Sequence, residues 1–132
     1  MSLFRFAFAA VTLSLAACAH TSDTFSDKGE AKLATLLEGR TAGSPQSCIA
    51  AFRDSRLSVI DGAAVVYDEG SVIWVARPSN PQSLRSNDIL IVERTSSQLC
   101  KQDIVRTVDR TGGFPTGVVF LGDFVPYRKA GN

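Results

Sequence analysis

The chain opens with a charge-free run of 12 residues, Phe6 to Ala17, which follows one basic side chain, Arg5. A transmembrane helix needs about 20 apolar residues to cross the hydrocarbon core of a bilayer, so this run is short for a membrane span. Its length and its place after a basic N-terminus are typical of the apolar region of an export signal. We therefore expect residues 1–17 to be removed as a signal peptide, which leaves 115 of the 132 residues to fold.

The apolar run ends in Leu15-Ala16-Ala17-Cys18, which resembles the lipobox of bacterial lipoprotein precursors. In such precursors small residues fit a narrow protease site, and the cysteine thiol receives diacylglycerol. The two acyl chains of the diacylglycerol and a further N-acyl chain hold a protein at the membrane much more strongly than a single acyl chain does. By resemblance to Gram-negative lipoproteins, Ala19 in place of aspartate implies sorting to the outer membrane, with the domain facing the periplasm. The alternative is ordinary cleavage after Ala19, since Ala17-Cys18-Ala19 also fits the small-x-small rule, and this would give a soluble periplasmic or secreted protein.

Size and charge limit what the exported part can be. Its length suffices for one compact domain. Of 14 basic residues only Arg5 lies in the signal, so 13 basic and 13 acidic residues remain, with no long run of either sign. Binding of nucleic acid and polybasic attachment to anionic lipid therefore have no support. Because the residues after Cys18 are small, polar and aperiodic, we expect a flexible tether over 18–28 and a single β-rich domain over 29–132.

Two cysteines remain once Cys18 is acylated. In an oxidising periplasm, Cys48 and Cys100 are expected to pair, which would close a loop of 53 residues and stabilise the fold by about 4 kcal/mol. The alternative is two separate buried thiols. Their spacing excludes a CxxC redox pair, and the one histidine, His20, lies in the tether, so we expect no metal and no cofactor.

The remaining pattern predicts one helix followed by short strands. Ser26 or Asp27 is a possible N-cap of a helix that runs to Glu38, with Gly39 as its C-cap glycine. Residues 77–87 read as a loop, and residues 96–101 as one turn around Cys100. The strand candidates are 48–53, 58–60, 63–67, 71–76, 88–93, 103–109 and a last pair, 117–121 and 124–127.

Turn signals separate these strands. Asp61-Gly62 and Asp68-Glu69-Gly70 predict hairpins, and Thr111-Gly112-Gly113 predicts a hairpin loop more simply than a phosphate cradle, because no helix start follows it. The fold class is therefore mainly β (α+β). We expect one N-terminal helix packed on a small antiparallel β-barrel or sandwich of about six to eight short strands.

Four groups of segments carry a resemblance: 36–43 before Cys48-Ile49, 59–62, 97–100 followed by 103–105, and 121–127. Together they resemble an uncharacterised family of small exported proteins from alphaproteobacteria such as sphingomonads and caulobacters, a domain of unknown function. The resemblance implies export and a compact domain, and it brings no established activity. Members of this family often have four cysteines in the domain. If this chain lacks both cysteines of one disulfide, the resemblance implies that the remaining two, Cys48 and Cys100, are partners.

The sequence contains no nucleophile and base set for catalysis, since His20 is too close to the lipid to be held in a folded site. Carboxylates are the remaining candidates, although aspartates at strand ends usually cap turns or face water. They are Asp54, Asp61, Asp88, Asp103, Asp109 and Asp123. Aromatic side chains could fill the core or line a ligand or peptide groove. They are Tyr67, Trp74, Phe114, Phe120, Phe124 and Tyr127.

We therefore expect a lipid-anchored, non-enzymatic protein that binds or supports an envelope protein or a cell-wall component. Two alternatives stay open. One is a small periplasmic hydrolase using a pair of carboxylates about 5–9 Å apart. The other is a soluble secreted binding or inhibitor module.

Overall fold

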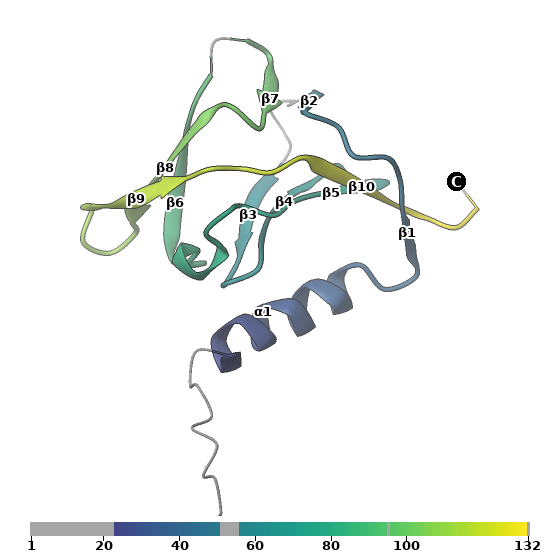
Figure 1. The fold of residues 1–132 in the computed structure, drawn as a ribbon, viewed down its shortest axis with the longest axis horizontal. Helices are drawn as coiled ribbons and strands as arrows, with labels where there is room; N and C mark the ends of the chain where they lie inside the picture. Colours follow the sequence, from purple (N-terminus) through teal and green to yellow (C-terminus); the bar gives the residue numbers. More distant parts are fainter. Residues whose placement is uncertain (1–22, 51–55, 95, 132) are drawn as a thin grey trace, which may run out of the picture.

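A computed structural model describes residues 23–50, 56–94 and 96–131. The predicted signal peptide, Cys18 and the first part of the predicted tether lie outside these residues, as does Asp54. The described chain contains helix α1 (Asp23–Leu36), a short 3-10 helix η1 (Pro81–Ser83) and ten strands in antiparallel sheets (Figure 1). The prediction of a mainly β fold with one N-terminal helix is confirmed, but the strands are more numerous than the six to eight expected.

The largest sheet has five strands and forms the centre of the molecule. Its order is β1 (Arg40–Ala42), β10 (Phe124–Lys129), β5 (Val72–Ala76), β4 (Ala64–Asp68) and β3 (Arg56–Ile60). The two predicted hairpins connect β3 to β4 and β4 to β5. Gly62 and Gly70 adopt positive φ values of 63° and 82° in these turns, a conformation that favours glycine. Strand β1 was not predicted.

The other strands form a three-stranded and a two-stranded sheet. The first has the order β6 (Asp88–Glu93), β8 (Ile104–Asp109) and β9 (Pro115–Val119), and the second pairs β2 (Cys48–Ala50) with β7 (Gln98–Cys100). The predicted hairpin loop joins β8 to β9, with Gly113 at φ 68°. The prediction of a turn at 96–101 is wrong for its central part, because Gln98–Cys100 pairs with β2 as a strand.

The last two strands do not pair with each other. Strand β9 pairs with β8, whereas β10 lies between β1 and β5, and in Figure 1 the two run end to end from one sheet to the other. Our expectation of a pair is therefore wrong. The chain between them crosses from one sheet to the other without reversing, so β10 finds both of its partners, β1 and β5, far away in the sequence.

Side-chain alternation in the five-stranded sheet builds two cores. Val66, Ile73 and Val75 pack on one face against Leu33 of α1. The other face packs against the remaining strands through residues that include Val65, Trp74, Ala76, Leu99, Val105, Val119 and Phe124. Because both faces are covered, β4 and β5 consist of almost continuous apolar residues. No sheet of the described chain closes on itself, so the layers fit the sandwich alternative.

Helix α1 begins at Asp23, earlier than the predicted cap at Ser26 or Asp27, so residues 23–28 of the predicted tether are helical. The helix ends at Leu36, and Gly39 follows with φ 71°, in the left-handed conformation of a C-terminal glycine. Within α1, Gly29 is buried against the turn between β3 and β4. The close approach of this turn fixes where the helix docks.

Gly29→Ala is expected to destabilise the protein by about 1–3 kcal/mol, although alanine favours a helix by about 1 kcal/mol. An added Cβ would overlap with the backbone carbonyl of Asp61 and lie 3.2 Å from the Cβ of Ala63. Urea denaturation of this variant should show a lower unfolding midpoint, whereas Lys32→Ala on the exposed helix surface should stay close to wild type. A Gly29→Ala variant more stable than wild type would contradict this docking.

Candidate functional site

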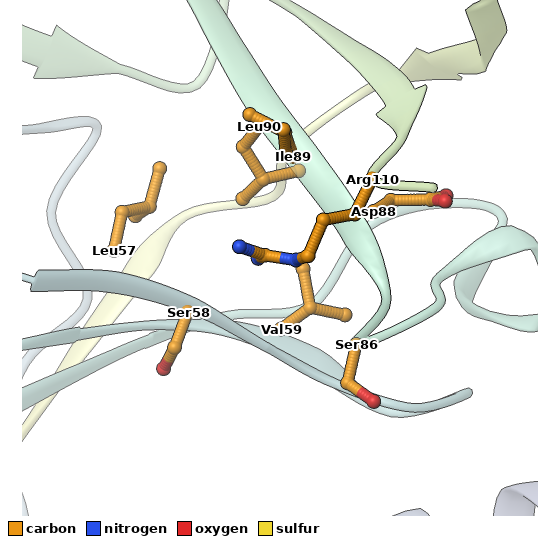
Figure 2. A pocket seen from close by; sticks show the side chains of 8 residues that line it. All are labelled: Leu57, Ser58, Val59, Ser86, Asp88, Ile89, Leu90 and Arg110. Carbon is orange, nitrogen blue, oxygen red and sulfur yellow. The ribbon is translucent and has the colours of Figure 1, made fainter. Parts of the chain in front are cut away.

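The two larger sheets face each other at a cleft between their edge strands. Strand β3 is an edge strand of the five-stranded sheet, and β6 is an edge strand of the three-stranded sheet. Together with Arg110, which follows β8, these strands and the loop before β6 border a cleft of about 500 Å³ (Figure 2). Its lining residues are Leu57, Ser58, Val59, Ser86, Asp88, Ile89, Leu90 and Arg110. A concavity of this size is within the range of small-ligand sites.

The cleft is closed at one corner by hydrogen bonds between loops. The Asp61 carboxylate accepts hydrogen bonds from the backbone N–H of Ser86 at 2.6 Å and from its hydroxyl at 2.9 Å. The N–H of Gly62 donates to the carbonyl of Leu84 at 3.3 Å. The turn after β3 is thus tied to the loop before β6, and this holds the two sheets at a set separation.

Aliphatic side chains form about half of the cleft lining, and polar and charged residues form the rest. Val59 is buried in the core between the sheets, and Leu57 and Leu90 are partly buried against the same core. Ile89, on the outer side of β6, is exposed. A ligand in this cleft would therefore meet aliphatic side chains from both sheets.

Arg110 places a positive charge beside these aliphatic side chains. Its backbone N–H donates to the carbonyl of Asn87 at 3.2 Å, which sets the start of the side chain beside β6. Figure 2 shows the guanidinium extending into the cleft, while the carboxylate of Asp88 points away from it. Among the described residues, Arg110 has neither an ion pair nor a side-chain hydrogen bond. Its charge is therefore available to a ligand.

A second hollow of about 510 Å³ lies next to the cleft and shares Asp88 with it. Asp88 is only 7% exposed, and it accepts a hydrogen bond from the Thr116 hydroxyl at 3.0 Å. Asp109 lines the same hollow and is directly opposite Asp88 in the β6–β8 register. The structure thus brings two of the candidate carboxylates together at one concavity.

The Asp109 carboxylate, however, is bound within its own hairpin. It accepts hydrogen bonds from the backbone N–H groups of Thr111 and Gly112 and from the amide of Asn87, the last at 3.1 Å. Such capping is the usual role of aspartate in turns.

Other aspartates act in the same way. Asp68 accepts a hydrogen bond from the N–H of Gly70 at 2.7 Å, and Asp103 accepts one from the N–H of Cys100 at 2.8 Å. The expectation that strand-end aspartates cap turns is confirmed at Asp103 and Asp109.

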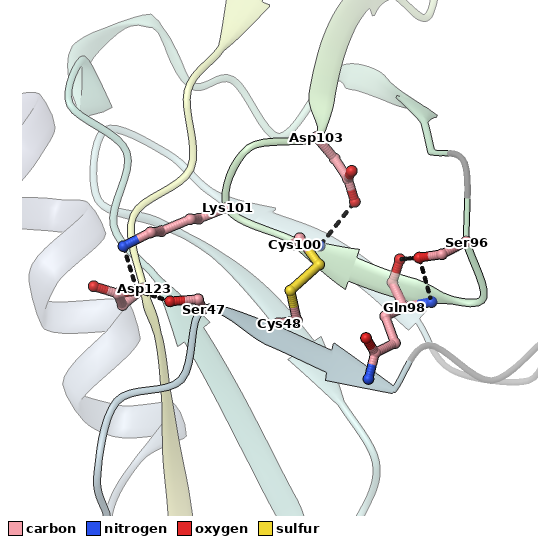
Figure 3. The surroundings of a disulfide bond; sticks show 8 residues. All are labelled: Ser47, Cys48, Ser96, Gln98, Cys100, Lys101, Asp103 and Asp123. Atoms are coloured by element: carbon pink, nitrogen blue, oxygen red, sulfur yellow. Dashed lines mark hydrogen bonds and ion pairs between the residues drawn. A yellow bond between two sulfur atoms is a disulfide. The ribbon is translucent and has the colours of Figure 1, made fainter.

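Cys48 and Cys100 are directly opposite each other in the β2–β7 pair and are joined by a disulfide (Figure 3). The two residues that the sequence predicts as partners are thus brought together. Their bond links segments 52 positions apart in the chain. It lies away from the cleft lining, which indicates a structural rather than a chemical role.

Asp123 holds the two ends of the disulfide region together. Its carboxylate accepts a hydrogen bond from the Ser47 hydroxyl at 3.1 Å and forms an ion pair with Lys101 at 2.8 Å (Figure 3). The hydrogen bond from Lys101, followed by that from Ser47, lowers the pKa of Asp123. The folded protein therefore favours the ionised carboxylate of Asp123. The stabilisation from this carboxylate is fully present above the ordinary aspartate pKa, and it is lost as the pH falls through the lowered pKa of the folded state.

Lys101→Ala is expected to raise the pKa of Asp123 toward the ordinary aspartate value. Ser47→Ala should raise this pKa by less, and Lys101→Arg should keep it low. NMR titration of the Asp123 carboxyl carbon in the four proteins measures these values directly. The same titration midpoint in wild type and Lys101→Ala would show that the ion pair is absent in solution.

The aromatic residues do not form one groove. Tyr67, Trp74 and Phe124 are buried, and the Trp74 indole donates to Glu69 at 2.9 Å. Phe114 and Phe120 are exposed near the two ends of β9. No aromatic side chain among the described residues lines the β3–β6 cleft. Its lining residues Leu57 and Arg110 were not identified from the sequence.

The described residues offer neither a cluster of metal ligands nor a membrane-spanning helix. No cluster of three or more histidine, cysteine, aspartate or glutamate side chains in this part of the chain could hold a metal ion. No helix among these residues combines the length and apolar character needed to cross a membrane.

Comparison of the chain with protein-family models, with curated proteins and with solved structures found no match in any of the three. The resemblance to an alphaproteobacterial family therefore stays a prediction.

Proposed function

We propose that the chain is a lipid-anchored envelope protein whose domain faces the periplasm and binds a ligand in the cleft between β3 and β6, without catalysing a reaction. The lipobox resemblance at Cys18 supports the anchor. The Arg110 guanidinium, which has no partner among the described residues and lies beside aliphatic side chains in the cleft, is the observation that carries the binding role. We also infer that the two larger sheets form a sandwich and that the cleft is its open side.

The environment of the carboxylates favours binding over catalysis. A retaining or inverting hydrolase needs one carboxylate free to act as nucleophile or base beside a second that acts as acid. Asp109 caps a hairpin, and Asp61 ties two loops together. These side chains have structural partners that a catalytic role would have to displace.

Photocrosslinking in cells tests the binding role. A photoreactive residue replaces Ser58, on the strand edge that borders the cleft, or Thr41 on β1 at the opposite edge of the five-stranded sheet as the control. We expect a defined adduct from position 58 that is absent from position 41 and is lost when Arg110→Glu is added. Identical adducts from both positions, or none from position 58, would contradict a ligand site in the cleft.

A hydrolase is the second candidate, because Asp88 and Asp109 border one hollow. Release of soluble fragments from purified peptidoglycan, lost in both Asp88→Asn and Asp109→Asn, would support it and overturn the non-catalytic proposal. Asp68→Asn, which lies outside the hollow, is the matched control. We expect no release by the wild-type protein.

A soluble secreted binding module is the remaining alternative. It shares the cleft with the proposed function and differs only in the fate of Cys18. Cell fractionation separates the two, because a lipid-anchored protein sediments with the membrane and is released by Cys18→Ser.

A further inference from the structure

The cleft is bordered by two strand edges without partners. In the described chain β3 pairs only with β4, and β6 pairs only with β8. The residues of β3 that line the cleft, 57–59, make no backbone hydrogen bond outside the β3–β4 pair. An edge strand presents a row of unpaired N–H and C=O groups that can pair with another extended chain.

These backbone groups decide which ligand fits. An acyl chain would cover the aliphatic walls but would leave the N–H and C=O groups of the edge without hydrogen-bond partners. An extended peptide covers the same walls and also pairs with the edge, since added strands bind through main-chain hydrogen bonds. A peptide therefore satisfies both features of the cleft.

The side chains along β3 define the pattern that such a peptide needs. Leu57 and Val59 face the core between the sheets, and Ser58 lies between them on the opposite side of the strand. Leu90 of β6 approaches from the other wall. A peptide added to β3 would set every second side chain against these aliphatic groups, so apolar residues should alternate with polar ones.

The charge of Arg110 sets a further requirement for the ligand. The Arg110 guanidinium enters the cleft without a partner among the described residues. Guanidinium and carboxylate groups form strong charge-assisted hydrogen bonds. The complementary ligand group is therefore a carboxylate at one end of the bound segment.

We propose that the β3–β6 cleft binds an extended segment of another envelope protein, which adds to the edge of β3, places alternate apolar side chains against Leu57, Val59 and Leu90, and pairs a carboxylate with Arg110. This inference rests on the proposed function, since it names the ligand of the same cleft.

The test uses the full chain in neutral detergent and four probes. The first is the peptide acetyl-Glu-Val-Ser-Val-Ser-Val-Glu-amide, which carries a carboxylate at each end because the strand direction is open. The second replaces both glutamates by glutamine, and the third is the first peptide with every second backbone nitrogen methylated. Octanoate is the fourth probe, as a carboxylate that cannot form a strand.

We expect the glutamate peptide to bind about tenfold more tightly than the glutamine peptide, as one charge-assisted contact predicts. Arg110→Gln should abolish this difference, whereas Lys129→Gln, which removes a positive charge from β10 away from the cleft, should preserve it. Hydrogen exchange should slow at the amides of residues 57–59 on peptide binding. The methylated peptide and octanoate should not cause this protection.

Equal affinity for the glutamate and glutamine peptides, or binding without protection in β3, would overturn the inference. Binding of octanoate in place of the peptides would also overturn it, but would leave the cleft as a ligand site. If none of the probes binds and photocrosslinking from position 58 gives no adduct, the proposed function fails as well.

Discussion

Replacing both Cys48 and Cys100 by alanine is expected to lower the free energy of unfolding by about 4 kcal/mol. The bond joins residues 52 positions apart, so its loss frees a long loop in the unfolded chain, and the chain-entropy treatment gives this magnitude. Stabilities of single domains are about 5–15 kcal/mol, so the loss is a large fraction of the total. Urea denaturation of the oxidised wild type and the double variant measures it.

Reduced wild type is the control for this experiment. It should unfold at nearly the same urea concentration as the double variant, because both lack the cross-link. Thiol labelling of unfolded, unreduced protein should find neither Cys48 nor Cys100 free. Equal stability of the oxidised protein and the double variant would contradict a stabilising bridge.

Phe124→Ala is expected to destabilise the protein by about 3–5 kcal/mol, the usual cost of removing a large buried aromatic side chain. Phe124 is 1% exposed and begins β10 in the core between the sheets. Its backbone also exchanges hydrogen bonds with Gln46 at 2.8 and 2.9 Å, which the substitution leaves intact. The effect therefore reports on packing alone.

Phe120→Ala is the matched control, because the same change is made four positions away at a side chain that is 64% exposed. It should change the unfolding midpoint little. Similar losses in the two variants would show that the core described for β10 is incorrect.

Local patterns in the sequence predicted the elements that local forces determine. Residues 104–109 alternate between exposed and buried positions as their period of two indicates, at least as far as Thr107. Gly62, Gly70 and Gly113 occupy positive-φ positions in the predicted turns. In these segments the turn residues and the apolar period point to the same structure, so no distant contact is needed to specify it.

The elements that were missed depend on distant partners. Strand β1 has three residues in a segment rich in turn formers, and it exists because Arg40–Ala42 pairs with β10. Strand β7 likewise forms against β2, where Cys100 is held opposite Cys48. The residues of a short sequence window therefore do not predict these strand pairings.

The candidate site could be predicted only in part. The sequence pointed to aspartates at strand ends, of which Asp103 and Asp109 cap turns. It did not point to Arg110 or Leu57, since the cleft arises where β3 and β6, which lie about 30 residues apart in the chain, become the edges of two different sheets. Strand order, rather than any local motif, creates the cleft.

The intact mass of the mature protein extracted from the membrane tests the anchoring most directly. The lipid anchor predicts a chain that begins at Cys18 and carries a diacylglyceryl group and an N-acyl chain. The same measurement on Cys18→Ser should show no acyl mass, and that variant should leave the membrane fraction. An unmodified chain that begins at His20 would show cleavage after Ala19 and would contradict the proposal of a lipid-anchored envelope protein.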